Sequence, residues 1–299
     1  MSEALPRIAL IGLGNMGGPI ASRWIDAGFC VTGFDLSAEA RAGLEARGGS
    51  TADTAAAAAA AADVVVLLLP DSRVVDAVIG DLLATGALEP DVVVVDMSSS
   101  DPEKTQANAE RLHTHGIRFI DAPVSGGVRG AEAGTLTIMV GGPLETVEQV
   151  RPVLEYLGTV IRVGEAGAGH AVKALNNLLS AVHLWATSEA VLVAEQFGVD
   201  AATLLQVVNG SSGRSASSEV KWPKFILTDA YDSGFSAQLM LKDARIATGL
   251  ATAMGLPTRL GDQLVDEWSH AVEELPAGAD HTEIARWLRQ RAHEDEHAS

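Results

Sequence analysis

The chain has 299 residues, of which 47% are hydrophobic and 20% are charged, and its formal net charge is −18. This composition suits a globular protein of one large or two smaller domains, and the acidic excess disfavours nucleic acid or an anionic membrane as a partner. A single cysteine, Cys30, excludes an internal disulfide. No basic segment precedes the first apolar run, so no secretory signal is predicted and a cytoplasmic location is expected.

A short apolar strand, Arg7–Ile11, leads directly into a glycine-rich turn, Gly12-Leu13-Gly14-Asn15-Met16-Gly17. A G-x-G-x-x-G pattern between a strand and a helix is typical of dinucleotide binding. Gly12 permits the tight turn, Gly14 lets the backbone approach a pyrophosphate, and Gly17 lets the helix pack on the strand. The helix predicted over 18–27 would then offer its free N–H groups to the phosphates.

The second strand, Cys30–Phe34, is followed by Asp35. An acid at this place commonly binds the ribose hydroxyls of NAD and repels the 2′-phosphate of NADP, so NAD is the expected cofactor. Arg41 follows closely enough to leave NADP open. The alternative is that Asp35 only caps the helix that begins near Ser37.

Four more apolar runs predict strands: 64–69, 92–96, 119–120 and 136–140. Their alternation with helical stretches indicates an α/β fold with a parallel, doubly wound sheet. Ligands of such sheets lie beyond the carboxyl ends of the strands, which places Leu69, Pro70 and the turn Ser98–Ser100 along the cofactor.

The segment Asp121–Gly127 reads Asp-Ala-Pro-Val-Ser-Gly-Gly. Gly126 and Gly127 leave the backbone N–H groups after Ser125 unshielded, so they can form an anion-binding nest. The alternative is a flexible turn that precedes a helix.

A long helix is predicted from Gly169 to Phe197, because apolar residues recur at three- and four-residue spacing without proline. It would be about 40 Å long, too long for the surface of one small domain, and we expect it to join two domains. Gly198 is a suitable C-cap. Lys173 and Asn177 share one face of this helix, although such a lysine is by itself most simply a solvent-exposed cation.

After this helix only helical periodicity is found, which predicts an all-α second domain. A polar turn, 209–215, interrupts it, and Lys242 and Asp243 are adjacent on a later helix. Three cations around the turn could bind a second anionic group of a substrate or simply face solvent: Arg214, Lys221 and Lys224. No metal site is predicted, because His113, His115 and the histidines of the C-terminal tail have no ligand-like neighbours.

Four motifs stand in one order along the chain: GLGNMGGPIA, DAPVSGG, GAGHAVKALNN and GFSAQLMLKDARIA. Together they resemble the β-hydroxyacid dehydrogenase family, the relatives of 3-hydroxyisobutyrate dehydrogenase and tartronate semialdehyde reductase. The resemblance implies a Rossmann NAD(P)-binding domain over 1–164 and an all-α domain for substrate binding and oligomerisation over 165–299. It further implies a homodimer or homotetramer and a small hydroxy acid as substrate.

The resemblance also assigns roles to residues. Lys173 would be the general acid/base for hydride transfer between NAD(P) and a 3-hydroxy acid or its semialdehyde, and its place near a helix start is expected to lower its pKa. Ser125, Gly126, Gly127 and Asn177 would bind the substrate. Ser99 and Lys242 would lie near the cofactor.

Some positions depart from the family pattern. His170 stands where glutamine is common, and GAGHAVK is similar to 6-phosphogluconate dehydrogenase, but that enzyme has histidine in place of Asn176 and lacks DAPVSGG. Imine reductases share the fold and replace the lysine found here at 173. A dinucleotide-binding sensor without turnover would not need Lys173, Asn177 and the glycine loop together.

Overall fold

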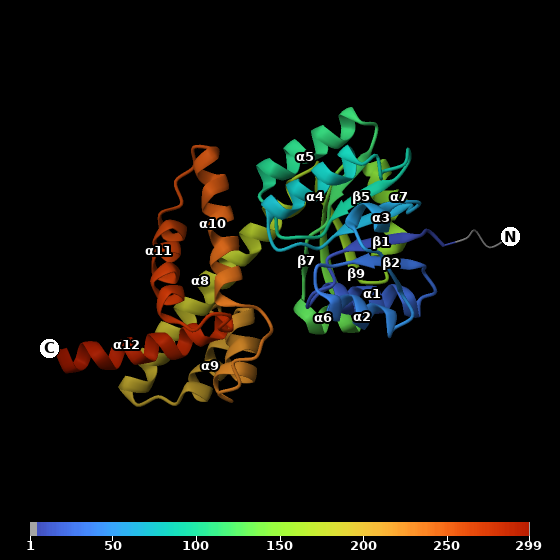
Figure 1. Cartoon of the computed structure of the whole chain (residues 1–299). Helices are drawn as coiled ribbons and strands as arrows, with labels where there is room; N and C mark the ends of the chain where they lie inside the picture. The colour runs from blue at the N-terminus through green and yellow to red at the C-terminus, as the bar shows by residue number, and fades with distance from the viewer. Residues whose placement is uncertain (1–4, 299) are drawn as a thin grey trace. The chain divides into compact units, whose positions relative to one another are not determined.

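The computed structural model describes residues 5–298 (Figure 1). Contacts divide the chain into two units, Met1–Lys173 and Ala174–Ser299, with the boundary inside helix α8 (Ala168–Phe197). This boundary falls shortly after the predicted one at 164/165.

The first unit is built on a sheet that has nine strands within the described residues. Its order is β3-β2-β1-β4-β5-β6-β8-β7, and β9 also pairs with β8. The strands are β1 (Ile8–Ile11), β2 (Val31–Phe34), β3 (Ser50–Thr51), β4 (Val64–Leu67), β5 (Val93–Asp96), β6 (Arg118–Asp121), β7 (Val124–Ser125), β8 (Leu136–Gly141) and β9 (Gly158–Gly164). β1 to β6 pair in parallel, which confirms the doubly wound α/β prediction. The order reverses between β1 and β4, and ligands of such sheets bind at this point.

The sheet departs from the predicted all-parallel pattern at β8, which runs antiparallel to β6 and β7 and parallel to β9. Three strands were not predicted from the sequence: β3, β7 and β9. β3 and β7 have two residues each, and β9 is only half-buried. None of them therefore carries the long apolar run that marks a buried strand.

Helices cover both faces of the sheet. They are α1 (Gly17–Asp26), α2 (Ala38–Glu45), α3 (Ala55–Ala59), α4 (Ser72–Ala84), α5 (Pro102–Thr114), α6 (Gly127–Ala133) and α7 (Leu144–Leu154). Alternate residues of each central strand enter different cores: Ile8 and Leu10 of β1 pack with Trp24 of α1, whereas Ala9 and Ile11 pack on the opposite face. This explains why the strands read as continuous apolar runs.

The second unit is helical, as predicted. After α8 it contains α9 (Ala201–Asn209), the π-helix η1 (Ser217–Ile226), α10 (Ala237–Ala253), α11 (Arg259–Glu274), the short 3₁₀ helix η2 (His281–Glu283) and α12 (Ile284–Ala298). Its core contains four tryptophans: Trp185, Trp222, Trp268 and Trp287. The ring of Trp185 lies 6.2 Å from that of Trp268 and 5.9 Å from that of Trp287.

Within residues 5–298, α8 is the one helix long and apolar enough to cross a membrane by length and composition. Ala181, Leu184 and Val191 of α8 are fully buried in the core of the second unit, whereas Leu179, Val193 and Phe197 of the same helix are exposed. Gly198 has φ +93° and ends the helix as predicted.

The polar turn predicted over 209–215 is held by its own side chains. The Ser218 hydroxyl donates to the Asn209 side-chain oxygen at 2.7 Å, and the Asn209 amide donates to the Ser218 carbonyl at 3.1 Å. The turn leads into η1, where the sequence predicted an ordinary helix. η1 contains Pro223, which has no N–H to donate to the carbonyl four residues earlier, and this disfavours regular α-helical pairing.

His281 in the second unit is a buried histidine that should make stability depend on pH. Its Nδ1 lies 3.0 Å from the Phe235 carbonyl oxygen, and the residue is only 4% exposed. Burial lowers the pKa of His281 to about 4; the Lys221 cation acts in the same direction and Asp280 in the opposite one. The folded state therefore favours the neutral ring, so this contribution to stability is complete above pH 6.5 and is lost as the pH falls toward 4.

Between pH 7 and pH 5 the His281 contribution to the free energy of unfolding should fall by about 2 kcal/mol. Urea unfolding followed by tryptophan fluorescence measures this, because four of the five tryptophans lie in the core of the second unit. In His281→Gln this part of the pH dependence should disappear, whereas His183→Gln, a change at an exposed helical histidine, should retain it. A pH dependence in His281→Gln equal to that of the wild type would contradict the prediction.

Candidate active site

The glycine turn after β1 has the geometry that a dinucleotide requires. Gly12 has φ +103°, and a Cβ there would lie 2.1 Å from the Leu68 carbonyl oxygen. A Cβ on Gly17 would lie 2.1 Å from the Gly12 carbonyl oxygen. Gly14 has nothing within 4 Å of its ideal Cβ position, so its backbone is open to a ligand. The three glycines thus divide their roles as the motif requires: tight turn, open approach and close packing.

The rest of the turn is fixed by Asp35, which follows β2. The Asp35 carboxylate accepts the N–H of Leu13 at 2.8 Å and the N–H of Ser37 at 2.8 Å. The cap of α2 is Ser37, not Asp35. The Arg41 guanidinium donates to the backbone carbonyls of Asp35 and Leu36, which places a cation next to the acid. Asn15 is exposed, and Met16 immediately precedes α1.

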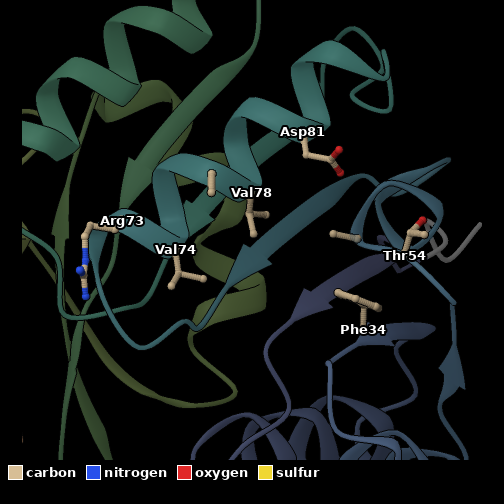
Figure 2. A pocket seen from close by; sticks show the side chains of 8 residues that line it. Phe34, Thr54, Arg73, Val74, Val78 and Asp81 are labelled. Atoms are coloured by element: carbon tan, nitrogen blue, oxygen red, sulfur yellow. The ribbon is translucent and has the colours of Figure 1, made fainter.

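A cavity of about 530 Å³ lies beside β2 and α4. Figure 2 shows Phe34 and Thr54 on one side of it and Val74 and Val78 of α4 on the other. Its lining is largely apolar, with Arg73 and Asp81 also at its edge. Phe34 directly precedes Asp35, so the cavity adjoins the segment predicted to bind ribose.

The turns after β4 and β5 are joined to each other. The Leu69 N–H donates to the Ser98 hydroxyl at 2.9 Å, and the Ser98 N–H donates to the Asp96 carboxylate at 2.9 Å. The Ser100 hydroxyl donates to the other Asp96 oxygen at 3.0 Å. Leu69 and Ser99 are partly buried and Pro70 is exposed. The hydrogen bonds around Ser98 hold the turns that contain these three predicted cofactor residues.

The predicted substrate loop is the junction of β7 and α6. Ser125 pairs with Thr137 of β8. Gly126 and Gly127 have φ values of +131° and +63° and are exposed. Because both torsions lie in the region that favours glycine, two consecutive glycines are required here, and the N–H groups are left accessible.

Lys173 lies near the start of α8, which is tied to the carboxyl edge of the sheet. The buried Asp121 carboxylate, at the end of β6, accepts the N–H of Gly167 at 2.7 Å and the N–H of His170 at 2.8 Å. The His170 ring lies between Thr105 and Ser98. Burial raises the pKa of the Asp121 carboxyl, and His170 and the two N–H donors act in the opposite direction. Lys173 itself is half-buried.

In the second unit, Asp243 connects the other two predicted site residues. The Asn177 amide donates to one Asp243 oxygen at 2.6 Å, and the Lys242 amine lies 3.5 Å from the other. Asn177 and Asp243 are buried, at 5% and 1% exposure. The Asn176 amide donates to the Asn177 oxygen at 3.1 Å. These bonds fix the orientation of the Asn177 side chain.

The three cations considered for a second anionic group differ in their surroundings. Arg214 forms an exposed ion pair with Glu219 at 2.9 Å. The Lys221 amine donates to the Ser180 hydroxyl at 2.7 Å, and Lys224 is exposed. The Arg214 and Lys224 positions favour the interpretation that these two are surface cations.

Sequence reasoning named several buried polar residues but did not predict the hydrogen bonds by which these residues support the site. The buried polar residues that support it are Asp96, Ser98, Thr105, Asp121, His170 and Asp243. One signal was available: Asp96 and Asp121 each directly follow apolar strand residues, and a buried acid there must have nearby donors. Their partners come from distant segments, which sequence spacing does not reveal.

Two family models match the chain. Residues 7–165 match the NAD-binding domain of 6-phosphogluconate dehydrogenase, and residues 167–288 match the NAD-binding domain of NADP-dependent 3-hydroxyisobutyrate dehydrogenase. Among curated relatives, 2-(hydroxymethyl)glutarate dehydrogenase of Eubacterium barkeri is 39% identical over 81% of this chain and 81% of that protein. The 3-hydroxyisobutyrate dehydrogenase of Pseudomonas aeruginosa is 39% identical over 85% of this chain and 88% of that protein.

A solved structure has a similar fold over most of this chain. It is the 3-hydroxyisobutyrate dehydrogenase of Mycobacterium tuberculosis with L-serine, which has a TM-score of 0.90, is 35% identical and covers 96% of this chain and 100% of that chain. The doubly wound sheet with its glycine turn, followed by an all-helical unit, defines a Rossmann-type NAD-binding oxidoreductase. The chain belongs to the β-hydroxyacid dehydrogenase family.

Proposed function

We propose that this protein oxidises the primary alcohol of a small 3-hydroxy acid to the semialdehyde with NAD, or catalyses the reverse reduction. The observation that carries the proposal is the placement of Lys173 in a helix whose start is bonded to Asp121 at the carboxyl edge of the sheet. The relatives support the substrate class: 2-(hydroxymethyl)glutarate, 3-hydroxyisobutyrate and L-serine all carry a hydroxymethyl group on the carbon next to a carboxylate.

The dinucleotide would be held by the glycine turn and by Asp35, with the adenine end in the apolar cavity beside Phe34. The open position at Gly14 fits a pyrophosphate, because nothing lies within 4 Å of the ideal Cβ position of this residue. When bound, the cofactor accepts a hydride from the carbinol carbon or returns it. Ser99 and Lys242 are the further residues that we place near it.

The protein's own residues bind the substrate and transfer its hydroxyl proton. The N–H groups of Gly126 and Gly127, with the Ser125 hydroxyl, bind the substrate carboxylate. Lys173 removes the hydroxyl proton during oxidation and returns it during reduction. Asn177, which is oriented by Asp243, donates a hydrogen bond to the reacting oxygen.

The proposal is tested by a spectrophotometric screen at 340 nm with NAD⁺ and a panel of 3-hydroxy acids that differ in the substituent next to the carboxylate. We expect turnover with at least one member and none with 2-hydroxy acids. Absence of turnover across the panel, together with tight NADH binding, would instead indicate a dinucleotide sensor.

The same screen with NADP⁺ tests the cofactor preference. The Asp35 carboxylate should disfavour a 2′-phosphate, because two like charges in contact repel each other. In Asp35→Asn we expect the ratio of kcat/KM with NAD⁺ to that with NADP⁺ to fall about tenfold, which corresponds to ~1.4 kcal/mol. Arg41→Ala should not lower that ratio. A wild-type preference for NADP⁺ would assign the dominant role to Arg41 instead.

A further inference from the structure

Asp121 and His170 have no role in the proton transfer proposed above, yet both are buried at the start of the helix that carries Lys173. Asp121 is fully buried and His170 is 1% exposed. The start of a helix leaves N–H groups without backbone partners. At the start of α8 two of these groups, those of Gly167 and His170, donate to Asp121, which lies far away in the sequence. A strand end therefore supplies the cap of this helix.

The contact is close enough to exclude any side chain between the helix and the sheet. A Cβ on Gly169 would lie 2.3 Å from the Met139 carbonyl oxygen and 2.7 Å from the Asp121 carboxylate. A Cβ on Gly141 would lie 2.5 Å from the same carboxylate and 2.9 Å from the Gly169 nitrogen. The first turn of α8 therefore has little freedom to shift along the ends of β6 and β8.

The His170 ring adds a second connection. Its Nε2 lies 3.0 Å from the Ser98 carbonyl oxygen, and its Nδ1 lies 2.8 Å from the Thr105 hydroxyl. The Ser98 hydroxyl in turn accepts the Leu69 N–H. A continuous chain of hydrogen bonds therefore joins α8 to the two turns where the cofactor is expected.

We propose that Asp121 and His170 are positioning residues that hold the first turn of α8, and with it the Lys173 amine, in register with the turns after β4 and β5. This inference rests on the proposed function. Lys173 follows His170 by three residues on the same helix, so a shift of the first turn moves the amine. A displacement of about 1 Å at a reacting group can cost on the order of 10²-fold in rate.

The decisive variant is Asp121→Asn. Asparagine keeps the volume but has one acceptor oxygen and one NH₂ group, so it cannot accept both the Gly167 and the His170 N–H in the observed arrangement. We expect kcat to fall about 10- to 100-fold, while KM and the Kd for NADH stay within about twofold. Amide hydrogen exchange in a peptide covering 165–176 should accelerate.

Two substitutions of His170 separate positioning from packing. His170→Leu fills the space but makes neither hydrogen bond, and it should lower kcat as Asp121→Asn does. His170→Gln keeps an N–H donor for the Ser98 carbonyl, so it should keep kcat within about threefold of the wild type. Asp200→Ala, which removes the side-chain cap of α9, is the control for general destabilisation and should leave kcat unchanged.

The outcomes distinguish the two proposals. A wild type that turns over no hydroxy acid contradicts the proposed function, and the assigned role of Asp121 and His170 then fails with it. An active wild type with unchanged kcat or unchanged exchange over 165–176 in Asp121→Asn overturns only the positioning role. Equal kcat losses in His170→Leu and His170→Gln would also overturn it, because hydrogen bonding would then not matter.

Discussion

Lys173→Ala should lower kcat by about 10²- to 10⁴-fold, the usual contribution of a general acid/base. The reason is that the hydroxyl proton would have no acceptor on α8 when the alcohol is oxidised. The Kd for NADH should stay near the wild-type value, because the glycine turn and Asp35 are untouched. Steady-state kinetics at 340 nm and fluorescence titration with NADH measure the two quantities separately.

Two further variants sharpen this prediction. Lys173→Arg keeps the charge, but a guanidinium remains protonated at any working pH and cannot accept the proton, so activity should not return. Lys224→Ala, at an exposed lysine in η1, should behave like the wild type. Normal turnover in Lys173→Ala would show that another group transfers the proton.

Alanine substitution in the dinucleotide turn should affect stability at Gly12 and Gly17 but cofactor binding at Gly14. In Gly12→Ala and Gly17→Ala, the new methyl group would meet a carbonyl oxygen at 2.1 Å. We expect each to destabilise the first unit by about 3 kcal/mol or more, because the backbone must move. Thermal unfolding would detect this as a lower transition temperature.

Gly14→Ala has the opposite expected profile. Its methyl group enters open space, so the free energy of unfolding should change by less than about 1 kcal/mol. The methyl group would stand where the pyrophosphate approaches, so affinity for NADH should fall about tenfold or more. Unchanged NADH affinity in a folded Gly14→Ala protein would contradict the assigned position of the pyrophosphate.

The sequence by itself determined most of the first unit up to β6. β1, β4 and β5 are buried on both faces, so they read as nearly unbroken apolar runs, and the glycine turn is a local motif with its own spacing. The long helix and the helical second unit were also predicted, because period and glycine placement are local properties. The region around β7, β8 and β9 was predicted incompletely, since an antiparallel partner and a half-buried edge strand leave little pattern in a single sequence.

Only the tertiary structure decided what supports the predicted site residues. Asp121 caps a helix that begins more than forty residues later, and the Asn177 amide donates to Asp243, 66 positions away. Hydrogen bonds of this kind depend on which chain segments folding brings together, and neither hydrophobic period nor local spacing encodes that pairing. Lys173 could therefore be proposed as a site residue from a motif, whereas the carboxylate that holds the start of its helix could be found only once β6 and α8 were seen in contact.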